Sequence, residues 1–242
     1  YCFVKPRELA YNNIENILTI EKEIANVFID ETEIKLDNPV EGVYTFTLGD
    51  NNLVMLDRLN LYLPPLNDND RGGERFIFKS QILANKLTEL LKNEIFDIDG
   101  CCEFVKVNEI FRYNKFFPDS NKFTMHHDIP YYDSKNQHAS KYTLLIYLTS
   151  GSNVEYCFNS EDANYSVTKI DKNNCIIFDQ KYSHEGKPYT KGPKIFIRTE
   201  LIFEIEDPDD NDSDTEQRKN SQLVFNTACY MSLQSIVNDN SL

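Results

Sequence analysis

Beyond Gly100 the sequence consists of short runs of β-branched and aromatic residues that are separated by turn-forming residues. The runs are CEFVKVNEIFRYN, KFTMHHD, YTLLIYLTS, VEYCF, YSVTKI, NCIIFD and KIFIRTELIFEI. None of them alternates with a long helical segment, as the strands of a parallel α/β sheet do. The pattern therefore predicts an all-β unit, a sandwich or a barrel, in this part of the chain.

The segments before Gly100 predict strands, a loop and a helix. VFIDETEIKL and GVYTFTLGDNNLVML contain short alternating apolar stretches, which are typical of strands. Residues 61–73, LYLPPLNDNDRGG, are rich in Pro, Asn, Asp and Gly and predict a loop. Residues 76–96 carry apolar side chains at helical spacing, which predicts a helix with one buried face.

Two further segments follow the β unit. EDPDDNDSDTEQRKN is a run of acidic residues with Pro and Ser and predicts a solvated loop. SQLVFNTACYMSLQSIV predicts a closing helix. We therefore expect a mainly β fold with flanking helices in a single domain, 1–242. Its parts are N-terminal strands and a supporting helix (1–100), the β core (101–205), and the acidic loop with the C-terminal helix (206–242).

Charge and cysteine usage limit the partners of the chain. Its 39 acidic and 25 basic residues give a formal net charge of −14, which argues against nucleic acid as the main partner. No apolar run approaches the ~18 residues of a membrane span, so we expect no membrane partner. The six cysteines form no CxxC pair and no zinc-like spacing. Reduced thiols are expected, which favours a cytoplasmic or nuclear protein.

Two of the four histidines stand next to each other in FTMHHD. Residues i and i+2 of a strand point to the same face, so His126 and Asp128 can present an imidazole and a carboxylate side by side. His127 then points to the other face. His138 lies in the polar segment DSKNQHASK, which predicts a loop without a functional role. Two histidines and one carboxylate on one face of an octahedron suit Fe(II) and leave three positions open.

The fourth histidine, His184 in YSHEG, precedes a basic strand. Alternation along KIFIRTELIF puts Lys194, Phe196 and Arg198 on one face of this strand. A cation there can pair with the distal carboxylate of a 2-oxo diacid, because charge-assisted pairs are strong.

Three segments in this order resemble the prolyl 4-hydroxylase-like branch of the 2-oxoglutarate oxygenases, from about Val107 to Phe203. FRYNKFFPDSNKFTMHHD resembles its Arg-Tyr pair, loop, Phe and H-x-D. YTLLIYLTS resembles its apolar strand ending in Tyr-Leu-Asn, and CIIFDQKYSHEGKPYTKGPKIFIRTELIF its closing segment with His-Glu-Gly, Gly-x-Lys and Arg-Thr-Asp. The chain departs from the branch at 153–158, NVEYCF, where members often have Gly-Gly-Glu-Thr-x-Phe. The resemblance implies a double-stranded β-helix (jelly-roll) core.

The resemblance also implies roles for individual residues. His126, Asp128 and His184 would bind Fe(II), with 2-oxoglutarate and O2 as cosubstrates and ascorbate as an additional candidate. Lys194 matches the residue that pairs with the distal carboxylate of 2-oxoglutarate. Arg198 is the alternative for this role, and its competing interpretation is a structural pair with a nearby acid. Tyr113 and Tyr147 match tyrosines that line the cosubstrate pocket, and packing in the core is the competing interpretation for both.

The activity implied is hydroxylation of a C–H bond with release of succinate and CO2. Halogenating relatives lack the carboxylate ligand, so Asp128 favours hydroxylation. A protein or peptide side chain such as proline is the first choice of substrate, and a small metabolite or free amino acid is the alternative. Two other classes compete: a catalytically idle member of the fold that binds a partner protein, and a metal-binding cupin, which would more often use several histidines. The sequence does not predict an oligomeric state.

Overall fold

The computed structural model describes residues 34–49, 66–68, 73–95, 103–118, 123–128, 130–133, 136–159 and 164–204. The predicted acidic loop and C-terminal helix lie outside these residues, as does most of VFIDETEIKL. Within the described residues, no helix has the length and apolar character needed to cross a bilayer.

The described strands form two antiparallel sheets. The larger sheet has the order β1-β2-β12-β9-β14-β6-β4-β3, with β5 paired to β14 and β8 paired to β9. Its strands are β1 (Asp37–Val40), β2 (Val43–Thr47), β3 (Leu66–Asp68), β4 (Gly73–Lys79), β5 (Phe104–Val107), β6 (Ile110–Phe116), β8 (Tyr132–Asp133), β9 (His138–Tyr147), β12 (Asn174–Asp179) and β14 (Lys194–Glu204). The smaller sheet has the order β11-β10-β13-β7. Its strands are β7 (Phe123–His126), β10 (Gly151–Asn159), β11 (Asn164–Ile170) and β13 (Ser183–Gly186). The mainly β, jelly-roll architecture expected from the sequence is confirmed.

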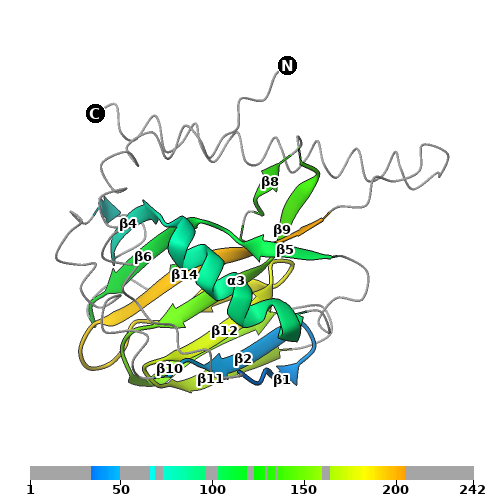
Figure 1. The fold of residues 1–242 in the computed structure, drawn as a ribbon. Helices are drawn as coiled ribbons and strands as arrows, with labels where there is room; N and C mark the ends of the chain where they lie inside the picture. Colours follow the sequence, from blue (N-terminus) through cyan, green and yellow to red (C-terminus); the bar gives the residue numbers. More distant parts are fainter. Residues whose placement is uncertain are drawn as a thin grey trace.

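The larger sheet buries both of its faces. On β9, Leu144 and Ile146 belong to the cluster that also contains the buried side of α3 (Gln81–Ile95), which lies across this face of the sheet in Figure 1. The alternate residues Leu145 and Tyr147 belong to a second cluster, which includes Ile170 of the smaller sheet. The central strands are therefore nearly continuous in apolar side chains, because one face packs on the helix and the other faces the smaller sheet. We call these the helix face and the inner face.

Helix α3 begins later than the sequence predicts. Residues 76–79 were expected to be helical but belong to β4, where they pair with β6. The helix begins after Ser80, whose buried hydroxyl accepts a hydrogen bond from the backbone N–H of Leu83 at 3.1 Å, as an N-cap does. Sheet pairing at 76–79 overrides the helical spacing of the apolar residues.

Three other local expectations were wrong or incomplete. The segment 61–73, predicted to be a loop, contains the short strand β3 and the first residue of β4. His138, predicted to lie in a loop, begins β9. The short strands β8 and β13 were not predicted as separate elements, since two and four residues give too little alternation to recognise.

Candidate metal and cosubstrate site

Three side chains from the predicted ligand set come together at the end of β7. The nitrogen and oxygen ligand atoms of His126, Asp128 and His184 all lie within 4.8 Å of one another. The strand ends at His126, so Asp128 follows outside it, although the sequence pattern placed both residues on one strand. The Nε2 of His126 nevertheless lies 4.0 Å from an Asp128 carboxylate oxygen, while the intervening His127 is exposed.

His184 enters the cluster through strand pairing. It lies on β13 directly opposite His126 of β7, with the ring centroids 4.3 Å apart. Its ring is buried and packs on Phe178, and its Nδ1 lies 3.3 Å from the carbonyl oxygen of Tyr182. A proton on Nδ1 leaves the lone pair on Nε2, which lies 3.8 Å from Asp128. Burial lowers the pKa of His184 to about 4 against the opposing effect of Asp128, so the imidazole is neutral, the form that binds metals.

Asp128 is a buried carboxylate that is kept ionised. Burial raises its pKa, but Arg198, His184 and Thr143 together outweigh burial and hold the pKa at about 2. The Nη2 of Arg198 lies 2.7 Å from Oδ1, and the Thr143 hydroxyl donates a hydrogen bond to Oδ2 at 2.6 Å. A negative carboxylate next to two imidazoles is the donor set that suits a divalent transition metal.

The separations of these atoms fit a shared metal ion. Nitrogen and oxygen ligands lie ~2.0–2.2 Å from comparable divalent metals, so neighbouring ligands of one octahedral ion are roughly 3 Å apart. The 3.8 Å and 4.0 Å separations between the imidazole nitrogens and the carboxylate are somewhat wider. A closure of about 1 Å would bring them to a common ion, a shift within the reach of side-chain rotation.

Lys194 lies at the start of β14 on the inner face and is almost completely buried, with 2% of its surface exposed. Its ammonium lies 5.7–6.0 Å from the ring centroids of Tyr147, Tyr189 and Phe196 and donates a hydrogen bond to the carbonyl oxygen of Lys187 at 3.1 Å. Burial lowers the pKa of Lys194 to about 7. An ammonium in such apolar surroundings is suited to an anionic ligand, which would restore its charge.

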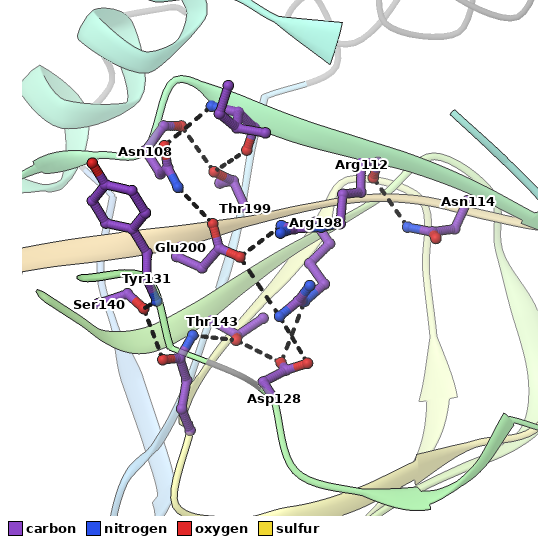
Figure 2. Close-up of polar contacts among 12 residues, drawn as sticks. Asn108, Arg112, Asn114, Asp128, Tyr131, Ser140, Thr143, Arg198, Thr199 and Glu200 are labelled. Atoms are coloured by element: carbon purple, nitrogen blue, oxygen red, sulfur yellow. Dashed lines mark hydrogen bonds and ion pairs between the residues drawn. The ribbon is translucent and has the colours of Figure 1, made fainter. Parts of the chain in front are cut away.

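Arg198, four residues further along β14, is engaged with acids of the protein. Besides Asp128 it approaches Glu200 at 3.6 Å. Glu200 is fully buried, 2.6 Å from the guanidinium of Arg112, and it also accepts a hydrogen bond from the side chain of Asn108. Figure 2 shows these side chains as one network that reaches Asp128. Sequence reasoning missed Glu200, although alternation along KIFIRTEL puts it on the face of Arg198.

The two candidate tyrosines lie on opposite faces of the larger sheet. Tyr147 pairs with Phe196 and lies in the inner cluster beside Lys194. Tyr113 pairs with Ile197, and both belong to the cluster under α3. Tyr113 therefore packs on the helix face, as its competing interpretation of packing in the core expects. The physical reason is register, since the inner-face positions of β6 next to Tyr113 are Arg112 and Asn114, opposite Arg198 and Phe196.

The fold can be compared with solved structures. No family model matches the chain, and no curated protein matches it. An oxidoreductase of the 2OG-Fe(II) oxygenase family from Burkholderia pseudomallei has a TM-score of 0.50 and 12% identity, and the match covers 67% of this chain and 85% of that one. HygX from Streptomyces hygroscopicus, with nickel and 2-oxoglutarate bound, has a TM-score of 0.50 and 10% identity, with 69% and 84% covered. A prolyl-4-hydroxylase from Pseudomonas putida has a TM-score of 0.49 and 13% identity, with 74% and 97% covered.

The two matches with a TM-score of 0.50 show that the described sheets have the fold of these solved structures. The chain has the double-stranded β-helix fold of structures in the 2OG-Fe(II) oxygenase family.

Proposed function

We propose that the protein is an Fe(II)- and 2-oxoglutarate-dependent dioxygenase that hydroxylates a C–H bond. The observation that carries the proposal is the convergence of two imidazoles, of which that of His184 is neutral, and one ionised carboxylate on this fold. A catalytically idle relative would be expected to have lost a ligand or the nearby cation. Here all three ligands are present, and so is a buried lysine on the inner face of the larger sheet.

His126, Asp128 and His184 would hold the metal. These three ligands would fill three positions of an octahedral ion and leave three for the cosubstrates. Bound Fe(II) together with 2-oxoglutarate and O2 supplies the oxidation: one oxygen atom enters the C–H bond, the other enters succinate, and CO2 is released. The side chains hold and orient the reactants and exclude water, as protein groups do around a reactive cofactor. Ascorbate remains an additional candidate as a reductant.

Lys194 is our choice for the group that binds the distal carboxylate of 2-oxoglutarate. Its ammonium is buried among aromatic rings, including that of Tyr147, where a charge-assisted pair is strong. Arg198 is less suited to this role, because its guanidinium already lies against Asp128 and Glu200. Aromatic walls on three sides would also keep water away from the bound acid.

A protein or peptide side chain such as proline is the proposed substrate. The support is the ordered set of sequence motifs that resemble the prolyl 4-hydroxylase-like branch. We also propose that the whole chain is one domain that works in the cytoplasm or nucleus. The buried free thiol of Cys175 fits a reducing compartment of this kind.

The first experiment measures succinate release from 2-oxoglutarate in the presence of Fe(II) and O2. Neighbouring histidines offer a matched pair of variants: His126→Ala removes a ligand, whereas His127→Ala removes an exposed imidazole that points elsewhere. We expect His126→Ala and His184→Ala to lose succinate release and His127→Ala to keep it.

Anaerobic binding must accompany this assay, because such enzymes can turn over slowly without their substrate. The intact protein should bind Fe(II), and then 2-oxoglutarate in a metal-dependent manner. Binding of neither ligand would refute the proposal. A peptide library and a panel of free amino acids, each read by mass for one added oxygen, then distinguish a protein substrate from a small metabolite.

A further inference from the structure

Three hydrogen bonds hold the carboxylate of Asp128. Oδ1 accepts from Nη2 of Arg198 at 2.7 Å. Oδ2 accepts from the Thr143 hydroxyl at 2.6 Å and from Nε of Arg198 at 3.3 Å. Arg198 thus contacts both oxygens with its planar fork, and Thr143 contacts one of them from β9 (Figure 2). A carboxylate offers about four lone-pair sites, so three donors leave roughly one for another partner.

Thr143 is itself held by a chain of hydrogen bonds that all run in one direction. The backbone N–H of Tyr131 donates to the hydroxyl of Ser140, and this hydroxyl donates to the side-chain oxygen of Gln180. The side-chain NH2 of Gln180 donates to the Thr143 hydroxyl at 3.1 Å, so the hydroxyl proton is left to point at Asp128. Thr143, Ser140 and Gln180 are all buried, and in such surroundings each bond of a chain strengthens the next.

Besides Asp128, Arg198 lies close to one buried acid of the larger sheet, Glu200. Its guanidinium approaches Glu200, which is fixed by Arg112 at 2.6 Å and by Asn108 at 2.8 Å. Arg112 and Glu200 are at most 5% exposed. Both groups that orient Asp128 are therefore held by other buried side chains, Thr143 by Gln180 and Arg198 by Glu200.

We propose that Thr143 and Arg198 are positioning residues, which hold the Asp128 carboxylate so that it presents one oxygen lone pair to the metal. The inference rests on the proposed function, since it concerns the carboxylate ligand of the same site. Without these donors the carboxylate would be free to rotate, and ordering it on binding would weaken metal affinity; bound through both oxygens, it would also take up a position that an oxygenase needs for its cosubstrates. Groups that orient a ligand typically contribute 10–100-fold to metal affinity or activity.

Thr143→Val is the sharpest test, because it removes the hydroxyl, keeps the shape of the side chain and changes no charge. We expect the dissociation constant for Mn(II), measured on the metal-free protein by electron paramagnetic resonance of free Mn(II), to rise about tenfold. Thr143→Ser restores a hydroxyl at the same place and should bind Mn(II) within about threefold of the intact protein, by the same reasoning.

Thr199→Val is the matched control. Thr199 is fully buried on β14, and its single hydroxyl proton is shared between the carbonyl oxygens of Asn108 and Ile110, away from the carboxylate. Its loss should lower the free energy of unfolding, as Thr143→Val does, and leave Mn(II) affinity unchanged. Equal losses of affinity in the two valine variants would overturn the proposal and reduce Thr143 to a structural role.

Arg198→Lys provides a second measurement if Thr143→Val proves too unstable to study. Lysine keeps the positive charge beside Asp128 and Glu200 but cannot reach both carboxylate oxygens as the guanidinium fork does. We expect Mn(II) binding to weaken about tenfold here also. Unchanged affinity in Thr143→Val, or in Arg198→Lys where the first variant cannot be measured, refutes the inference alone. Failure of the intact protein to bind Mn(II) refutes the proposed function, and the inference with it.

Discussion

Replacing Lys194 by methionine should abolish 2-oxoglutarate binding and, unusually for a buried position, make the protein more stable. The side chain is 2% exposed and surrounded by aromatic rings, and burial lowers its pKa from the ordinary 10.5 to about 7. In water the same ammonium is fully charged at neutral pH. The folded protein therefore maintains an ionisable group at a cost, which methionine would remove while it fills a similar volume.

The magnitude follows from the size of this shift. One pKa unit is worth ~1.36 kcal/mol, so a lowering to about 7 costs on the order of 4 kcal/mol at neutral pH. Between pH 7 and pH 10.5 the unfolded chain binds more protons than the folded protein, so stability rises with pH in this window. The cost is complete below pH 7 and disappears above the unfolded pKa. Lys194→Met should flatten this part of the stability profile.

Affinity for 2-oxoglutarate should change with pH in the opposite direction to stability. A dianion bound at Lys194 favours the charged ammonium, so 2-oxoglutarate binding must take up a proton wherever the free side chain is neutral. The dissociation constant should therefore rise as pH increases from 7 to 9, by up to about tenfold per unit. Lys194→Arg keeps its charge throughout this range and should lose the pH dependence.

Two assays test this reasoning. Urea unfolding at pH 6, 7 and 9 gives the stability of the intact protein and of Lys194→Met, and anaerobic calorimetry with a redox-inert metal gives 2-oxoglutarate affinity. If Lys194→Met binds 2-oxoglutarate as the intact protein does, Lys194 is not the group that binds it. If the variant is less stable by several kcal/mol, Lys194 is a stabilising core residue and its burial carries no net cost.

Three other substitutions test separate parts of the structure. Glu200→Gln removes the acid from a fully buried ion pair and should cost about 3–5 kcal/mol in urea unfolding; a loss below 1 kcal/mol would contradict the network. Ser80→Ala removes the N-cap of α3 and should cost about 1 kcal/mol while Mn(II) affinity stays unchanged. Gly151→Ala places a methyl group 2.4 Å from the ring of Tyr189, so it should cost about 1–3 kcal/mol and weaken 2-oxoglutarate binding, because this ring lies beside Lys194. Normal affinity in that variant would show that the ring does not shape the pocket.

The sequence predicted the β architecture because strand signals are strong in this chain. Runs such as YTLLIYLTS and NCIIFD lie in central strands that are buried on both faces, where continuous apolar character is required. The beginning of α3 was predicted too early, since residues 76–79 fit a helical pattern equally well. Only their pairing with β6, which is a tertiary contact, decides that they form a strand. Local spacing does not contain this information.

The parts of the site that depend on local sequence could be predicted, and those that depend on tertiary contacts could not. His126 and Asp128 are two residues apart in the sequence, so their proximity could be predicted. The structure places His126 Nε2 4.0 Å from an oxygen of Asp128. The partner of Arg198 could not be predicted, because Asp128 lies 70 residues away in the sequence. The sheet face on which Tyr113 lies depends on the register between β6 and β14, which sets Tyr113 opposite Ile197. A one-residue change of register moves every side chain to the other face, and register is not written in either strand alone.

The inner face of β14 shows how one strand can serve two purposes. Lys194, Arg198 and Glu200 share this face because alternation repeats every two residues. Buried charges are expensive unless they are compensated, and the protein compensates Arg198 and Glu200 with Asp128 and Arg112. Burial lowers the pKa of Lys194 to about 7, and a bound acid from outside the chain would favour its charged form. On this face of β14, Arg198 therefore orients a metal ligand, whereas Lys194 is expected to bind the cosubstrate. Substitution of Arg198 should accordingly weaken Mn(II) binding, and substitution of Lys194 should weaken 2-oxoglutarate binding.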